Sequence, residues 1–132
     1  MKRKTGRIMM AVSLLILGLQ TGAAETNRIY NAESVEAGRR LYQIHCPACH
    51  GQDARARIDF VSDATDLTTP ARYRNGSTPA DLFRSISEGA GTDMPPFQYT
   101  LTRVDDRWHL IHFIISTWTP EERAVFLGDS NE

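Results

Sequence analysis

The sequence predicts an all-α fold of three to five short helices in a single domain. Three observations support this prediction. Apolar residues recur at helical spacing in several segments of the 132-residue chain. A hydroxyl residue stands at the start of each such segment, as is common at helix N-termini; these residues are Ser34, Thr78, Thr102 and Thr119. Alternation of apolar and polar residues, which would indicate strands, is sparse throughout.

The first 24 residues have the three-part composition of a secretory signal peptide. Four basic residues lie at the start, residues 8–19 read IMMAVSLLILGL without a charge, and the small residues TGAA follow. The apolar run is shorter than the roughly 20 residues that a membrane-spanning helix needs. We therefore expect cleavage near Ala24, a periplasmic domain over residues 25–132, and no membrane span in the mature chain. An uncleaved anchor made of the same apolar segment is the alternative.

Removal of residues 1–24 changes the charge balance. It takes away four of the 15 basic residues and none of the 16 acidic ones, so 11 minus 16 leaves a formal net charge of −5. No basic stripe interleaves with aromatic residues, which argues against nucleic acid as a partner. A polar partner of complementary charge is favoured instead.

The first helix is predicted over residues 34–45, with Ser34 as its N-cap. The residues that would share its inner face are Val35, Gly38, Leu41 and Tyr42. This helix leads directly into the segment HCPACHG, residues 45–51.

That segment places both cysteines of the chain, Cys46 and Cys49, beside His50. A disulfide across C-x-x-C closes too small a loop to stabilise a fold much, and a redox-active pair is expected in a βαβ unit, whereas no strand is predicted before Cys46. A zinc site would need two further ligands at finger-like spacing. In C-x-x-C-H, by contrast, the two thiols form thioethers to haem and the adjacent imidazole binds its iron. Pro47 can begin the turn that carries Cys49 and His50.

The second axial ligand is expected to be Met94. It is the only methionine beyond residue 24, and it lies in the Gly/Pro-rich stretch GAGTDMPPFQ, residues 89–98. Glycines permit a loop there, and prolines lower its conformational entropy. The alternative is a methionine that fills the core. Three histidines are rivals, but His45 should point away from the iron, and a satisfied or partly buried role is expected for His109 and His112.

Three later helices are predicted. Thr78 begins one through T-P-A-D and Gly89 ends it, with Leu82, Phe83 and Ile86 inward. Thr102 begins the next through T-R-V-D, running to about Thr117, with Trp108, Ile111 and Ile115 inward. Thr119 begins the last through T-P-E-E, ending near Gly128. A frayed terminus is the alternative for this tail.

With these features the chain resembles the class I c-type cytochromes, the monohaem, His/Met-ligated family of bacterial electron carriers. The residues that carry the resemblance are GRRLY with Gly38 and Tyr42, CPACHG with Cys46, Cys49, His50 and Gly51, MPPF with Met94, and Trp108 and Phe113. The resemblance implies a small cytochrome c fold wrapped around one covalently bound haem c. It also implies that Gly38 lets the first and last main helices approach, and that Tyr42 meets Trp108 or Phe113.

The expected function is single-electron transfer rather than catalysis. A methionine ligand raises the reduction potential and closes the sixth site to substrate, and no nucleophile–base pair is evident. Donor and acceptor proteins would dock transiently at the haem edge. Arg55, Arg57, Arg72 and Arg74 either line that surface, pair with haem propionates, or are solvated loop residues.

Two other functions stay open. The chain could be a dedicated cytochrome subunit of a periplasmic dehydrogenase or reductase. It could also be a haem ligand-binding protein or peroxidase in which Met94 leaves the iron.

Overall fold

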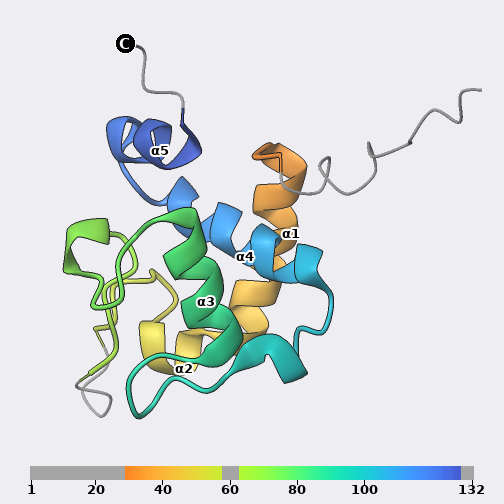
Figure 1. The fold of residues 1–132 in the computed structure, drawn as a ribbon, viewed down its shortest axis with the longest axis vertical. Helices are drawn as coiled ribbons and strands as arrows, with labels where there is room; N and C mark the ends of the chain where they lie inside the picture. Colours follow the sequence, from red (N-terminus) through yellow and green to blue (C-terminus); the bar gives the residue numbers. More distant parts are fainter. Residues whose placement is uncertain (1–28, 58–62, 129–132) are drawn as a thin grey trace, which may run out of the picture.

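The described part of the chain is helical. In a computed structural model the described residues are 29–57 and 63–128, so the predicted signal peptide lies outside them. The helices are α1 (Ala32–His45), α2 (Pro47–His50), α3 (Pro79–Glu88), α4 (Val104–Ser116) and α5 (Pro120–Leu127), with 3-10 turns η2 (Pro70–Arg72) and η3 (Phe97–Tyr99). The one β-type pairing among these residues is an isolated bridge between Ala90 and Met94. The predicted all-α class is confirmed (Figure 1).

The packing of α1 against α4 organises the fold. A Cβ atom built on Gly38 would overlap the carbonyl oxygen of His109, so the two helix backbones meet where α1 has no side chain. One turn further along α1, the ring of Tyr42 lies 4.9 Å from the ring of Phe113. Both contacts confirm the crossing that the resemblance implied. Figure 1 shows α3 beside this pair and α5 at the end of the molecule opposite α2.

The start of α1 differs from the prediction. Ser34 is not the N-cap, because Asn31 holds the extended backbone before the helix and its Oδ1 accepts a hydrogen bond from the Ser34 amide at 2.8 Å. The Ser34 hydroxyl in turn accepts from the Asn31 amide at 3.0 Å. The two residues thus form a reciprocal capping box, and the serine is its third-position member.

The start of α4 also differs, by one residue. Thr102 was expected to begin this helix, but its N-cap is Arg103, which makes no side-chain cap hydrogen bond. Asp105 and Asp106 fall in the first turn, where negative charge is favourable beside the exposed amide groups. Two of the three residues expected to face inward are fully buried, Ile111 and Ile115.

The other two predicted helix starts are confirmed. Thr78 caps α3 with Asp81 as the reciprocal residue, and Thr119 caps α5 with Glu122. Gly89 and Gly128 end these helices, as predicted. The predicted tail is therefore a capped helix.

Helix α5 is joined to the rest of the core through aromatic residues. Phe126 packs edge-on against Trp118, with ring centroids 5.4 Å apart. The Nε1 of Trp118 donates to the carbonyl oxygen of Leu67 at 2.9 Å, and the Tyr73 hydroxyl donates to the same oxygen at 2.7 Å. The loop that contains Leu67 is thereby fixed to the C-terminal part of the chain.

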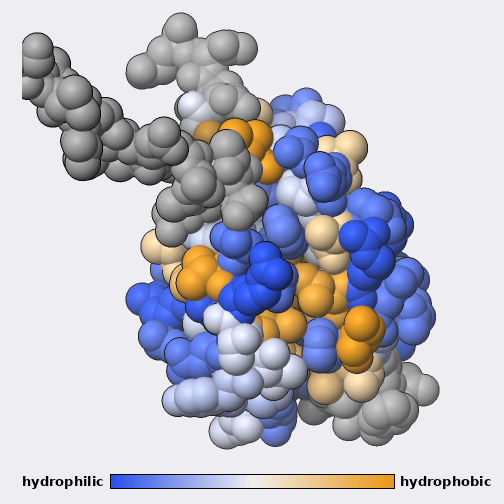
Figure 2. All heavy atoms as spheres, turned by 90° about the vertical axis from the view of Figure 1, so that its right-hand side faces the viewer, coloured by the Kyte–Doolittle hydropathy of each residue, from blue (hydrophilic) through white to orange (hydrophobic). Residues whose placement is uncertain are grey.

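One face of the molecule is mostly hydrophilic in its coloured part (Figure 2). Figure 2, which views the side carrying α1 and the start of α4, shows hydrophobic side chains between hydrophilic ones. Among the exposed large apolar residues are Ile44 and Tyr99, at 72% and 77% exposure. None of the helices within residues 29–57 and 63–128 has the length and apolar character needed to cross a membrane.

Candidate functional site

A cavity of about 300 Å³ lies between α2 and the loop that carries Met94. Cys46, Cys49 and His50 line it, and so does Met94. The side chains that make its apolar walls include Leu67, Leu82, Ile86, Phe97, Leu110 and Ile114. An apolar cavity with a few converging polar groups is the usual form of a cofactor site, for which volumes of about 300–1,000 Å³ are typical. The structure thus brings all four residues predicted for the site around one space.

The two cysteines are placed by a change of direction between α1 and α2. Cys46 is the C-cap of α1 and the N-cap of α2, and Pro47 begins α2 as predicted. Both cysteines are half-buried and neither is in a disulfide. Burial, with a smaller effect from Cys49, raises the pKa of the Cys46 thiol to about 12. The Cys46 thiol is therefore part of the apolar wall of the cavity.

His50 is oriented by the backbone of a distant loop. Its Nδ1 lies 2.9 Å from the carbonyl oxygen of Thr65. Burial lowers the pKa of His50, and the contact with Thr65 only partly opposes this effect. A neutral imidazole that donates from Nδ1 leaves Nε2 to bind a metal, which is the usual arrangement of a histidine ligand.

Met94 is held by a narrow turn after α3. The Ala90 amide donates to the Met94 carbonyl oxygen at 3.2 Å. Gly89 has φ +86°, and a Cβ atom there would lie 2.5 Å from that same oxygen. Beyond Met94 the loop continues into η3, where the Leu101 amide donates to the Phe97 carbonyl at 2.7 Å. The backbone on both sides of the methionine is therefore constrained.

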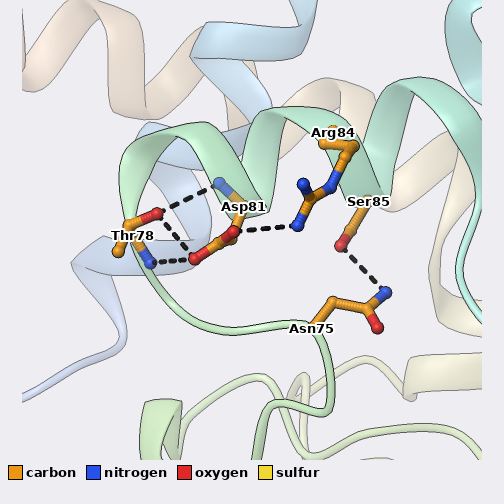
Figure 3. Close-up of polar contacts among 5 residues, drawn as sticks. All are labelled: Asn75, Thr78, Asp81, Arg84 and Ser85. Atoms are coloured by element: carbon orange, nitrogen blue, oxygen red, sulfur yellow. Dashed lines mark hydrogen bonds and ion pairs between the residues drawn. The ribbon is translucent and has the colours of Figure 1, made fainter.

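Helix α3 supports this wall through its capping box (Figure 3). The Thr78 hydroxyl donates to Asp81 Oδ2 at 2.6 Å, and the Arg84 guanidinium donates to Oδ1 at 2.9 Å. The hydroxyl hydrogen bond is the main cause that lowers the pKa of Asp81. Asn75 lies 3.4 Å from the Ser85 hydroxyl, and both residues line the cavity. The loop before α3 is thus tied to its second turn.

The other histidines lie in different places. His45 lines the rim of the cavity, with its ring 6.0 Å from that of Phe97, so it is closer to the site than expected. His112 is 2% exposed and packs edge-on against Tyr30 at 5.7 Å. Neither His109 nor His112 lines the cavity.

Four arginines identified in the sequence meet at a second, polar hollow. Arg55, Arg57, Arg72 and Arg74 line it together with Asp63 and Asp66. Asp63, Ala64, Thr65 and Arg74 line both the hollow and the apolar cavity, so the two spaces adjoin. The sequence suggested three alternative roles for these arginines but did not predict that they lie together.

The residues around the cavity fit a haem group. Within the described ranges, no group of three or more His, Cys, Asp or Glu side chains could hold a metal ion. A metal held by His50 and Met94 would therefore need its remaining ligands from a cofactor. A flat tetrapyrrole supplies them, and the apolar walls with two flanking thiols suit its ring and its vinyl groups.

The comparisons agree with this chemistry. Residues 33–114 match the family described as cytochrome C oxidase, cbb3-type, subunit III, and the chain belongs to this family. The resemblance to c-type cytochromes and the predicted cytochrome c fold are thereby confirmed. The protein is accordingly an electron-transfer haem protein.

A solved structure is also similar. It is a chain of the reducing HAO-like protein complex of Kuenenia stuttgartiensis, with 27% sequence identity and a TM-score of 0.61. The match covers 69% of this chain and 46% of that chain, so this protein spans less than half of its neighbour. No curated protein matches the sequence significantly.

Proposed function

We propose that the protein is a periplasmic single-electron carrier with one haem c, attached through Cys46 and Cys49 and ligated by His50 and Met94. One observation carries the proposal: the C-x-x-C-H motif and the only methionine beyond residue 24 lie on the wall of one apolar cavity. The haem supplies reversible one-electron chemistry at its iron. No catalytic residue is proposed.

The chain's own residues would keep this chemistry simple. The Thr65 carbonyl holds the His50 ring in one orientation. The constrained backbone around Met94 holds this residue at the cavity, where its thioether would occupy the second axial position of a haem iron and exclude substrate. Apolar side chains from α3 and α4 exclude water, which lowers the reorganisation that accompanies electron exchange.

Attachment is tested by the mass of the denatured mature protein. Protein from cells competent in cytochrome maturation should carry the mass of one haem, and a Cys46→Ser, Cys49→Ser double variant should carry none. The bare polypeptide mass in the unmutated protein would contradict covalent attachment.

Ligation by Met94 is tested by replacing it. Met94→Ala should abolish the weak long-wavelength sulfur-to-iron band of the oxidised protein, lower its potential and allow carbon monoxide to bind the reduced form. Tyr99→Ala is the matched control, because Tyr99 is an exposed residue of the same loop region at 77% exposure. An unmutated protein that lacks the band and binds carbon monoxide readily would instead support the ligand-binding or peroxidase function.

Export is tested by N-terminal sequencing of the native protein. The basic start and short apolar run of residues 1–24 support cleavage, so sequencing should begin near Glu25 in a periplasmic fraction. A protein that begins at Met1 in a membrane fraction would be anchored, which would contradict a diffusible carrier.

A second candidate is a dedicated cytochrome subunit of an oxidoreductase complex. It is favoured by the family description, which names an oxidase subunit, and by a similar chain that comes from a complex. Size-exclusion chromatography of the native protein separates the two candidates. A carrier elutes at the size of one chain, whereas a subunit elutes with its catalytic partner.

A further inference from the structure

The polar hollow beside the cavity concentrates positive charge. Its volume is about 530 Å³, and its lining contains four arginines and two aspartates. Three of the arginines, Arg55, Arg57 and Arg72, line the hollow but not the cavity. All three are exposed. They are therefore accessible from outside at the edge of the site.

The two aspartates of the hollow already have partners. Asp63 accepts from Arg74 at 3.4 Å, so these two charges offset each other. The Thr68 amide and hydroxyl donate to Asp66 at 2.9 and 2.7 Å. Burial opposes ionisation of Asp66, but these hydrogen bonds and nearby Arg55 and Arg72 outweigh it and lower the pKa of this carboxyl. An ionised Asp66 balances one of the remaining three arginines.

The hollow is opposite in sign to the rest of the described residues. Residues 29–57 and 63–128 contain ten arginines and 12 acidic residues. The hollow takes four of the former and two of the latter, which gives its described lining a formal charge of +2. The other six arginines and ten acidic residues of these ranges give −4. Over the described residues, an acidic protein is thus attracted at the hollow and repelled by the net charge of the rest.

The loop that presents Arg55 and Arg57 is fixed to the site. The Ala56 amide donates to the His50 carbonyl at 2.8 Å, and the Leu67 amide donates to the Ala54 carbonyl at 2.7 Å. Ala54 and Ala56 have φ values of +61° and +53°, a conformation that non-glycine residues rarely adopt. A loop held this firmly loses little entropy when a partner binds.

We propose that Arg55, Arg57 and Arg72 form a docking surface for an acidic face of the protein that exchanges electrons with this one. The inference rests on the proposed function, because it names the kind of partner that the carrier would meet. Charge complementarity at a hollow beside the cavity would orient the partner toward the haem and raise the rate of productive encounter.

The test uses the reduced holoprotein and two small oxidants of opposite charge. Hexacyanoferrate(III) is an anion and tris(phenanthroline)cobalt(III) is a cation, and each accepts one electron from the protein. Rates are measured by stopped flow between about 0.05 and 0.5 M salt, where the screening length is about 10 Å or less at most concentrations and local charge dominates. The rate of oxidation by the anion should fall as the salt concentration rises, because salt screens its attraction to the arginines. The rate of oxidation by the cation should not fall.

Variants locate the effect. Arg55→Gln, Arg57→Gln and Arg72→Gln together should slow oxidation by hexacyanoferrate(III) about tenfold at low salt and remove its salt dependence. The control changes three exposed arginines elsewhere, Arg39, Arg40 and Arg103, to Gln. These pair with nearby carboxylates, and Arg39 also lies over the Phe113 ring at 5.5 Å. The control should change that rate by less than about twofold. Single Arg57→Gln and Arg72→Gln variants serve if the triple variant does not fold.

Two results would overturn the proposal. Equal effects of the hollow and control variants would show that only net charge matters. Loss of haem from the triple variant, or an unchanged anion rate together with a shifted potential, would assign these arginines to the haem propionates. The absorption spectrum and the reduction potential are recorded for the unmutated protein and for each variant. A failure of haem ligation is thereby distinguished from a failure of docking.

Discussion

Gly38 of α1 lies directly against the carbonyl oxygen of His109 in α4. A Cβ atom on Gly38 would overlap this oxygen and would lie 2.9 Å from the Cβ of Phe113. Both obstacles belong to backbone or to the base of a side chain, so neither can move away without shifting a helix. An adjacent face of α4 carries Leu110 and Ile114 to the cavity wall. The helix crossing therefore determines where that wall stands.

Gly38→Ala should destabilise the protein by at least about 2 kcal/mol, because the methyl group must push α1 from α4. This loss exceeds the gain of up to about 1 kcal/mol from the better helix propensity of alanine. Gly128→Ala is the control, since Gly128 has a positive φ but no atom within 4 Å of its built Cβ. It should cost only about 1 kcal/mol. Urea unfolding of both variants measures the difference.

Gly89→Ala should weaken Met94 coordination. The new Cβ would lie 2.5 Å from the Met94 carbonyl oxygen, so the turn must shift. We expect a weaker sulfur-to-iron band and a lower potential. Gly91→Ala has a similar positive φ of +63°, but its nearest neighbour is a flexible Arg74 nitrogen at 4.0 Å. Equal spectra for the two variants would contradict a special role of the Gly89 turn.

Thr78→Ala and Thr119→Ala remove equivalent caps from two helices. Each should cost about 1 kcal/mol in urea unfolding at neutral pH. Of these two helices only α3 lines the cavity, so only Thr78→Ala should also alter the haem spectrum. A spectral change with Thr119→Ala alone would contradict this assignment.

The stability that Thr78→Ala removes should also depend on pH. The Thr78 hydroxyl holds the pKa of Asp81 below its usual value of 3.8. A lowered pKa stabilises the fold above the unfolded-state value, and this contribution is lost as the pH falls through the folded-state value. The stability difference between the unmutated protein and Thr78→Ala should therefore narrow below about pH 4. Urea unfolding at pH 3 and pH 7 measures it.

Ala56→Gly should stabilise the protein by up to about 1 kcal/mol. Left-handed backbone costs alanine roughly 1–2 kcal/mol, and the greater unfolded-state freedom of glycine offsets part of the gain. Ala54→Gly relieves similar strain, but Ala54 is 1% exposed and would lose a buried methyl worth about 0.8 kcal/mol. We therefore expect a near-neutral effect at position 54. Thermal unfolding of the two variants checks the ranking.

Much of the fold could be predicted because its signals are local. The T-P-x-D/E pattern of residues 78–81 and 119–122 specifies a cap, a first helical residue and a reciprocal partner within four positions. The two errors also concern caps. Asn31 and Ser34 are both residue types that cap helices. The N-cap is the one with extended backbone, and residue type alone does not show that this is Asn31. At α4 the N-cap is Arg103, one residue after Thr102, and it makes no side-chain cap hydrogen bond, so residue type gives no signal for this start.

Candidate residues for the site could be chosen from the sequence where side chains would carry the chemistry, and not elsewhere. The C-x-x-C-H motif and Met94 could be identified by residue type alone. The partner of His50 is a main-chain oxygen of Thr65, and every residue offers such an oxygen. The walls made by Leu110 and Ile114 depend on how α4 lies across the cavity, which only the tertiary structure determines. The tertiary structure also determines that the four arginines lie together at one hollow.

The aromatic junction at α5 has a practical consequence for handling this protein. Phe126 supports Trp118, Trp118 holds the carbonyl of Leu67, and Thr65 lies two residues before Leu67 against the His50 ring. A truncation or a bulky fusion that displaces α5 would thus reach the imidazole through this series of contacts. An affinity tag at the C-terminus is therefore not a neutral addition, and a spacer after Gly128 should precede it.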